Sequence, residues 1–294
     1  MQGIIVKALS GFYYVETDKG VFECKARGKF RNQNTSPLVG DRVVISVSGK
    51  SGTIETIEER KNMLTRPPIA NIDKLFIVSG LVTPVPSTLL IDRIIAICEY
   101  KNIEPVIVFN KTDLASAEEY QCIYKNAGFK TITCSAKTGE GMDEIKAELE
   151  GCISAFTGNS GAGKSSILNA IFSSLNLSTA EISEKLGRGR HTTRHTELFR
   201  HEYGGYVADT PGFSLIDNEK DDLEFKDALP TLFRDFEEYI NSCMFHDCKH
   251  VAEKGCAVIE AVQNGKIEKS RYDSFTTIYN ELKDLKAWQV KKKG

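Results

Sequence analysis

The sequence lacks a long hydrophobic run. None of its apolar stretches approaches the roughly 18 consecutive residues that mark a membrane-spanning helix, although the chain has 294 residues. The amino terminus also has neither a long hydrophobic segment nor a signal-peptide cleavage pattern. We therefore expect a cytoplasmic protein that does not enter a membrane.

A surplus of charge of either sign is also missing. The chain has 38 Lys and Arg against 40 Asp and Glu, a net charge of −2, so it lacks the overall basic character of many nucleic-acid-binding proteins. The charge is unevenly distributed, because residues 1–66 hold 11 Lys and Arg against 7 Asp and Glu. Five cysteines are scattered singly, as is typical of a reducing compartment: Cys24, Cys98, Cys122, Cys134 and Cys152.

The amino-terminal segment has an all-β pattern. Five short β-prone runs occupy residues 3–9, 12–17, 21–27, 40–47 and 52–57, which predicts a small closed barrel of the oligonucleotide-binding type. Lys25, Arg27, Lys29 and Arg31 alternate around Phe30, an arrangement suited to contact with an RNA backbone. The alternative is a solvated strand face. Pro67-Pro68 indicates a linker, so we expect an RNA-binding barrel over residues 1–66.

From residue 73 onward the pattern alternates between strand and helix. Residues 74–79 and 105–109 are apolar runs typical of buried parallel strands, and residues 89–98 have the spacing of an amphipathic helix. This alternation continues to Gly212 and predicts a doubly wound parallel sheet. We assign it residues 67–218.

A phosphate-binding loop is the strongest local signal in this region. The pattern GxxxxGKS comprises Gly158, Asn159, Ser160, Gly161, Ala162, Gly163, Lys164 and Ser165, with Ser166 continuing into an apolar helical pattern. Such a turn lets backbone N–H groups surround phosphate oxygens at the positive end of the helix. We expect Lys164 to reach the β- and γ-phosphates and Ser165 to bind Mg²⁺.

Two further motifs predict a guanine pocket. Asn110-Lys111-Thr112-Asp113 has the pattern NKxD, and Ser135-Ala136-Lys137 resembles the loop that backs the base. Asp113 can accept hydrogen bonds from the guanine N1–H and amine, which adenine does not present together, so the motif selects GTP and GDP and disfavours a metabolic ATPase. We expect the Asn110 side chain on the base edge, the Lys111 stem along the base face and the Ala136 N–H on the guanine oxygen.

The remaining nucleotide motifs concern Mg²⁺ and catalysis. Asp209-Thr210-Pro211-Gly212 follows a strand-like run, so Asp209 should hold Mg²⁺ through water while the Gly212 N–H approaches the γ-phosphate. Thr193, in preference to Thr192, should add a hydroxyl to the metal. Ras-like enzymes use a glutamine after this motif to orient water, but here Phe213 and Ser214 follow. His191 is the candidate replacement, the alternative being an ordinary exposed loop histidine, whereas His195 and His201 need no role beyond facing solvent.

The carboxyl-terminal region has the pattern of a zinc site. Cys243, Cys248, His250 and Cys256 follow the spacing Cys-x4-Cys-x-His-x5-Cys, and three thiolates with one imidazole form a closed tetrahedral set for one structural Zn²⁺. His246 is the alternative histidine ligand. Residues 222–240 and 272–290 have helical patterns, so we expect a zinc-binding helical domain over residues 219–294. The final run, Lys291-Lys292-Lys293, could contact RNA.

Ordinary GTPases place the phosphate loop before the base-reading loops, and here the order is reversed. The series NKTD, SAK, GNSGAGKS, RGRHTTR, DTPG and then the cysteine cluster, behind an amino-terminal barrel, resembles the RsgA family of circularly permuted bacterial GTPases, also called YjeQ or YloQ. The resemblance covers essentially the whole chain. It implies a bound Mg²⁺ and a bound Zn²⁺, the latter held by Cys243, Cys248, His250 and Cys256. It also implies GTP hydrolysis in which His191 replaces the glutamine and Lys164 and Thr193 assist.

The resemblance also implies a partner. A member of this family should act late in maturation of the small ribosomal subunit, bind that subunit and its rRNA, and hydrolyse GTP faster when bound. We expect a monomer. A rival interpretation is an RNA-binding scaffold or translational regulator, gated by nucleotide, in which hydrolysis is incidental.

Overall fold

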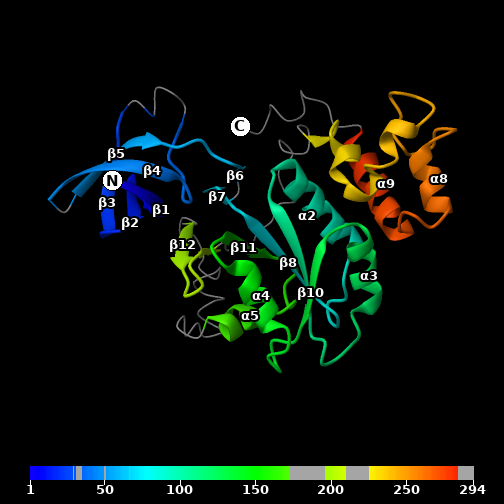
Figure 1. Ribbon diagram of the computed structural model, residues 1–294, viewed down its shortest axis with the longest axis horizontal. Coiled ribbons are helices and arrows are strands. Elements are labelled where there is room, and N and C mark those ends of the chain that lie inside the picture. The colour runs from blue at the N-terminus through cyan, green and yellow to red at the C-terminus, as the bar shows by residue number, and fades with distance from the viewer. Residues whose placement is uncertain are drawn as a thin grey trace.

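The computed structural model describes residues 1–28, 30, 35–49, 51–65, 67–172, 196–209 and 225–283, with Asp209 described by its backbone alone. Figure 1 shows an amino-terminal barrel and a carboxyl-terminal group of helices at opposite ends of the molecule, with a mixed sheet and its helices between them. Among the helices in these ranges, none has both the length and the apolar composition to cross a membrane.

The barrel has five strands. They are β1 (Gln2–Leu9), β2 (Phe12–Thr17), β3 (Gly20–Ala26), β4 (Arg42–Ser48) and β5 (Ser51–Ile57). Strand β1 pairs with β2 and β4, β2 pairs with β3, and β3 pairs in parallel with β5, which returns to β4. The sheet therefore closes on itself, and the predicted barrel of the oligonucleotide-binding type is confirmed.

The basic strand of the barrel differs from expectation at its aromatic residue. The Lys25 ammonium lies 5.1 Å from the centre of the Phe12 ring, and Arg27 pairs with Glu55 at 2.8 Å. Phe30 is only 5% exposed and belongs to the barrel core. The expectation that Phe30 lies among the basic side chains for contact with RNA is therefore wrong, because apolar burial takes its ring inward. Lys29 and Arg31 lie outside the described residues.

A short hairpin, β6 (Met63–Thr65) and β7 (Pro68–Ala70), occupies the expected linker. Ile69 is fully buried and bridges to Val39 at the barrel. On the other side, the Asn62 amide donates to the carbonyls of Ile72 and Asn102 at 2.7 and 3.1 Å. The hairpin is thus a packed joint between the barrel and the central sheet.

The central sheet has five parallel strands in the order β10-β9-β8-β11-β13. They are β8 (Lys74–Gly80), β9 (Glu104–Asn110), β10 (Lys130–Cys134), β11 (Ile153–Thr157) and β13 (Tyr206–Asp209). Four helices of the described residues pack on them: α2 (Thr88–Tyr100), α3 (Glu118–Asn126), α4 (Met142–Leu149) and α5 (Lys164–Ile171).

Alternate residues of these strands enter two different cores. Leu75 and Ile77 of β8 pack with α2 and α3, whereas Phe76 and Val78 pack with α4 and α5. Successive side chains of a strand point to opposite faces, so burial of both faces requires the near-continuous apolar runs seen in the sequence. The predicted doubly wound sheet is confirmed.

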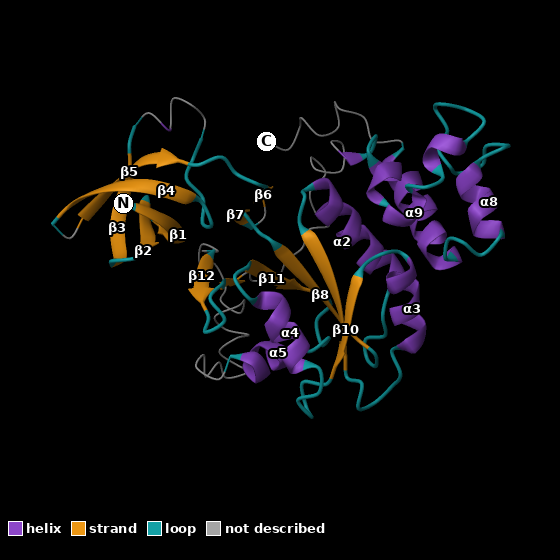
Figure 2. Cartoon of the chain, in the orientation of Figure 1, coloured by secondary structure: helices purple, strands orange, loops and turns teal. Residues whose placement is uncertain are grey.

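One further strand, β12 (Glu197–Arg200), joins the sheet to the barrel. It lies antiparallel to β13 on one side and to β1 on the other, so Lys7, Glu197 and Asp209 form one row across three strands. Lys7 pairs with Glu197 at 2.9 Å, and Arg200 pairs with Glu16 of β2 at 2.7 Å. The barrel and the central sheet therefore form one continuous hydrogen-bonded sheet. Figure 2 shows β12 between the barrel and the rest of the central domain.

The carboxyl-terminal region corrects the predicted helix over residues 222–240. From residue 225 onward the chain instead makes short 3-10 turns, η3 (Leu229–Leu232), η4 (Arg234–Phe236) and η5 (Ile240–Ser242). Pro230 stands at the start of η3, and Phe233 is extended, with φ −106° and ψ 100°, which interrupts any helix. Two regular helices follow, α8 (Ala257–Gln263) and α9 (Lys269–Leu282), the second beginning three residues earlier than expected.

A buried arginine joins this region to the central domain. Arg271 of α9 is fully buried, and its guanidinium donates to Asp92 of α2 and to Asp235 of η4, each at 2.7 Å. The Phe233 ring lies 4.7 Å from the guanidinium carbon. Both ion pairs are shielded from water, so they hold α9 and η4 against α2.

Candidate nucleotide and zinc sites

The predicted nucleotide motifs meet at one edge of the central sheet. Its parallel strands end at Gly80, Asn110, Cys134, Thr157 and Asp209, and a motif follows or ends each of four of them. Because β9 and β10 are neighbours and β8 separates β9 from β11, the base-reading loops lie beside the phosphate loop despite their separation in sequence. Ligands of open α/β sheets bind at this edge.

The phosphate loop depends on glycines at two close approaches. Gly158 has φ +136°, and a Cβ there would lie 1.9 Å from the Val78 carbonyl oxygen. Gly163 has φ +96°, and a Cβ there would lie 2.1 Å from the Asn110 amide nitrogen. A side chain at Gly158 would displace backbone, and a side chain at Gly163 would displace the Asn110 amide.

The loop ends at the amino terminus of α5. Gly163 caps this helix without any side-chain hydrogen bond, so its first N–H groups are not used by a capping side chain and can receive an anion. The Lys164 ammonium curls back to donate to the carbonyls of Gly158 and Asn159, at 2.6 and 2.9 Å. Burial lowers the pKa of Lys164. A bound phosphate would compensate for this burial by adding a negative partner.

Asp113 is fixed at the base-reading side. Its Oδ1 accepts from the Ser135 hydroxyl at 2.8 Å, while its Oδ2 lies 3.8 Å from the Lys137 ammonium. The Ser135 hydroxyl also accepts the Thr138 N–H at 3.2 Å. Ser135 thus orients the carboxylate that we expect to read guanine.

The Asn110 side chain has a role that the sequence did not indicate. It is 2% exposed, donates to the Ala162 carbonyl at 3.0 Å and accepts the Ala136 N–H at 3.1 Å. One amide therefore joins the phosphate loop to the SAK loop. Its Oδ1 also accepts from the Cys134 thiol at 3.7 Å, so all its partners here are protein groups, and the expected contacts of Asn110 and Ala136 with the base remain predictions.

Lys111 adds a loop that the sequence analysis missed. Its ammonium donates to the carbonyls of Val82 and Thr83 at 2.9 and 3.0 Å. These residues follow β8, and Pro84 lies 3.5 Å from where a Cβ would stand on Gly161. The loops that follow β8, β9 and β11 therefore meet here. The pairing of β8 with β9 places the loop after β8 at the site, and the local sequence pattern did not reveal it.

The switch residues are described only in part. Asp209 ends β13, where its backbone is the register partner of Glu197. His191, Thr192, Thr193 and Gly212 lie outside the described residues. His201 corrects the expectation that it faces solvent, because it is 8% exposed and its Nδ1 accepts the Tyr203 N–H at 3.3 Å. Burial lowers the pKa of this imidazole.

Three cysteines and a histidine form a compact cluster in the carboxyl-terminal region. The ligand atoms of Cys243, Cys248, His250 and Cys256 all lie within 4.8 Å of one another. His250 Nδ1 lies 3.5 Å from the sulfurs of Cys243 and Cys256, which are 3.9 Å apart. A tetrahedral zinc ion with bonds of about 2.3 Å to sulfur and about 2.0 Å to nitrogen requires about 3.5 Å between nitrogen and sulfur and about 3.8 Å between the two sulfurs. The residues therefore fit Zn²⁺.

Burial favours the neutral forms of both a thiol and the imidazole of the cluster. Burial raises the pKa of Cys248 to about 12 and lowers the pKa of His250. Neutral imidazole is ready to coordinate, whereas the thiols must release protons as zinc binds. His246, the alternative ligand, is exposed and is not part of the cluster.

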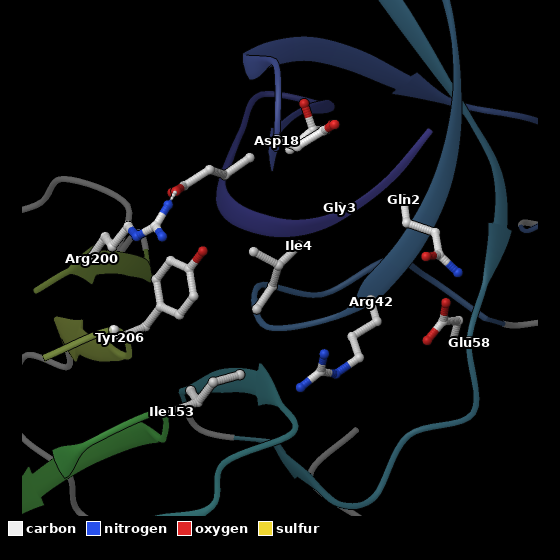
Figure 3. Close-up of a pocket in the computed structure, with 13 residues that line it drawn as sticks. Gln2, Gly3, Ile4, Asp18, Arg42, Glu58, Ile153, Arg200 and Tyr206 are labelled. Atoms are coloured by element: carbon white, nitrogen blue, oxygen red, sulfur yellow. Dashed lines mark hydrogen bonds and ion pairs between the residues drawn. The ribbon is translucent and has the colours of Figure 1, made fainter.

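A cleft of about 540 Å³ separates the barrel from the sheet beside β12 (Figure 3). Arg200 and Tyr206 line it from the sheet, and Ile4 and Arg42 line it from the barrel. The cleft is distinct from the nucleotide edge.

Comparison with known proteins agrees with this geometry. The RsgA GTPase family model matches residues 57–219, and the RsgA N-terminal domain model matches residues 2–54. The chain belongs to the RsgA GTPase family. It is therefore a GTPase, and the family resemblance seen in the sequence is confirmed.

Several relatives of this chain share the name small ribosomal subunit biogenesis GTPase RsgA. The protein of Caldanaerobacter subterraneus subsp. tengcongensis is 46% identical over 97% of this chain and 96% of its own length. That of a Geobacillus species is 47% identical over 97% and 98%. Among solved structures, YjeQ from Thermotoga maritima is similar, with a TM-score of 0.81 and 38% identity over 97% of this chain and 99% of that one.

The permuted order also has a structural counterpart. The crystal structure of YloQ, described as a circularly permuted GTPase, has a TM-score of 0.81 and 38% identity over 97% of this chain and 96% of that one. The permuted RsgA fold, with its barrel and helical carboxyl-terminal region, is thereby confirmed.

Proposed function

We propose that this RsgA protein binds the small ribosomal subunit late in its maturation and hydrolyses GTP to GDP and phosphate when bound. The observation that carries the proposal is the single edge at which Asn110 joins the phosphate loop to the base-reading loop. The names of the relatives support the choice of partner. The barrel, the GTPase and the zinc-binding region would comprise residues 1–66, 67–218 and 219–294.

Guanine selection rests on Asp113. Ser135 holds one carboxylate oxygen at 2.8 Å, and the side chain of Asp113 is 16% exposed, so the carboxylate is oriented but accessible. It would accept the N1–H and amine of guanine, while Lys111 would cover the base face. Lys137 lies at the open side of the same carboxylate.

Phosphate chemistry rests on the loop and helix α5. The loop N–H groups from Gly158 to Ser166 would bind the phosphates, with Lys164 neutralising charge that develops on the β- and γ-phosphates. Ser165, Thr193 and a water held by Asp209 would bind Mg²⁺, which supplies charge neutralisation across those phosphates. His191 would position the attacking water, because the position after Gly212 lacks a glutamine.

The barrel and the metal cluster supply the outer contacts. The surplus of positive charge over residues 1–66 and the exposed Lys25 and Arg27 suit phosphate groups of rRNA. One Zn²⁺ on Cys243, Cys248, His250 and Cys256 would supply the fold of the carboxyl-terminal region.

The test is GTP turnover with and without purified small ribosomal subunits. We expect subunits to stimulate turnover, and His191→Ala to lose about 10²- to 10⁴-fold of the stimulated rate while retaining GTP affinity. His246→Ala is the matched control, since that exposed histidine lies outside both sites. Absence of stimulation would favour the nucleotide-gated scaffold, and normal turnover of His191→Ala would return that residue to an ordinary loop role.

A further inference from the structure

The histidine of the cysteine cluster stands in an unusual backbone conformation. His250 has φ +59°, in the left-handed region that is unfavourable for a non-glycine residue. The chain reverses at this residue, and the reversal brings Nδ1 to 3.5 Å from two of the cysteine sulfurs. Another interaction must stabilise this conformation for the imidazole to remain there.

The Glu253 carboxylate supplies that interaction. Its Oε1 accepts the Lys249 N–H at 2.8 Å, and its Oε2 accepts the N–H groups of Val251 and Ala252, each at 3.0 Å. These amides flank His250 on both sides. Among the hydrogen bonds of the described residues, none of the three donates to another backbone acceptor, so one carboxylate satisfies three N–H groups of the reversal.

The charge state of this carboxylate is secure. Burial alone would raise the pKa of Glu253, but the N–H groups of Lys249, Ala252, Glu253 itself and Val251 outweigh it and hold the pKa at about 2. The three bonds are charge-assisted and therefore stronger than bonds between neutral groups. A second anchor is the Tyr272 hydroxyl of α9, which donates to the Val251 carbonyl at 3.1 Å.

We propose that Glu253 is the positioning residue of the zinc site, holding the His250 loop in the conformation that brings its imidazole to the metal. The inference rests on the proposed zinc site and adds a residue outside the four ligands. Residues that orient metal ligands without touching the metal typically change metal affinity by about 10- to 100-fold when replaced. Glu253 does so through the backbone rather than through the imidazole itself.

The experiment compares the variants Glu253→Ala and Glu253→Gln with the unaltered protein, using Zn²⁺ as the probe. Zinc content of the unaltered protein is measured first, followed by competition with a chelator and by X-ray absorption at the zinc edge. Glu238→Gln is the matched control, because it removes an exposed carboxylate from the same region. We expect Glu253→Ala to bind zinc about 10- to 100-fold more weakly, Glu253→Gln to lose less because one oxygen still accepts, and the control to be unchanged.

The absorption spectrum separates positioning from stability. If Glu253 positions His250, the zinc that remains bound to Glu253→Ala or Glu253→Gln should show weaker outer-shell scattering from imidazole while its sulfur contacts persist. Unchanged affinity in both variants, or weakened affinity with full imidazole scattering, would overturn the proposal. If Glu253→Ala does not fold, the Glu253→Gln result decides. An unaltered protein without zinc would refute the zinc site itself.

Discussion

Replacement of Arg271 by Met is the perturbation whose size the structure best determines. Arg271 and Asp92 have fully buried side chains, and that of Asp235 is 7% exposed. Removal of the guanidinium leaves two carboxylates in an apolar surrounding without their cation. Loss of one partner from a buried ion pair typically costs about 3–5 kcal/mol, so we expect α9 to detach from α2 in Arg271→Met far more often than in the unaltered protein.

The same network of Arg271, Asp92 and Asp235 predicts that the stability of α9 against α2 depends on pH. Burial raises the pKa of Asp92, and the Arg271 guanidinium opposes that shift. A carboxyl group with a raised folded pKa contributes stability below its unfolded pKa and loses it as pH rises through the folded value. Without Arg271 the folded pKa should rise further. The stability that Arg271→Met loses relative to the unaltered protein should therefore become smaller as pH falls from about 8 to about 5, since protonation removes the buried charge.

Hydrogen exchange of the α9 and α2 amides measures this opening directly. A cost of about 3–5 kcal/mol corresponds to exchange roughly 10²- to 10⁴-fold faster. Lys269→Met on the same helix is the control, because its ion pair with Asp273 is exposed and should contribute less than about 1 kcal/mol. Arg271→Met with Asp92→Leu and Asp235→Leu should recover most of the loss. Equal exchange in Arg271→Met and Lys269→Met would refute the reasoning.

Two further predictions concern the nucleotide edge. Asp113→Asn should weaken GTP binding and favour xanthosine triphosphate, whose oxygen accepts where guanine donates, and a competition assay that still prefers GTP would remove Asp113 from the pocket. Gly163→Ala should sharply weaken binding of both GTP and GDP, because the added Cβ would stand 2.1 Å from the Asn110 amide. Gly128→Ala is its control, with φ +82° and no atom within 4 Å of the added Cβ, and equal affinities in these two variants would contradict the role of the close approach.

The sequence predicted those parts of the site that depend on strand ends and local turns. Apolar runs such as residues 105–109 mark strands buried on both faces, and a motif that follows such a run must lie at the carboxyl edge of the sheet. Glycine spacing likewise indicated the phosphate loop before its geometry was known. The cysteine spacing indicated the ligand set, and the structure chose His250 over His246 because only one of them is buried.

Local sequence patterns could not predict contacts between segments that are far apart in the chain. The Asn110 amide bridges two loops only because β9 and β11 flank β8, and a pattern of four residues carries no information on that arrangement. The helix expected over residues 222–240 failed for a related reason. Its apolar spacing suits a helix, but Pro230 and the packing of Phe233 and Phe236 around Phe275 impose short turns instead. Tertiary packing there overrides local propensity.

The row Lys7, Glu197 and Asp209 has a mechanical consequence. Neighbouring strands lie about 4.8 Å apart, so the barrel begins about 10 Å from the backbone of the strand end that borders the nucleotide edge. The barrel cannot swing away from the central sheet without breaking the β1–β12 pairing and the ion pairs at both ends of β12. A force applied to the barrel by a bound partner therefore reaches the central sheet by two routes, the four-residue strand β12 and the β6–β7 hairpin. Of these two, β12 leads directly to the strand end at Asp209.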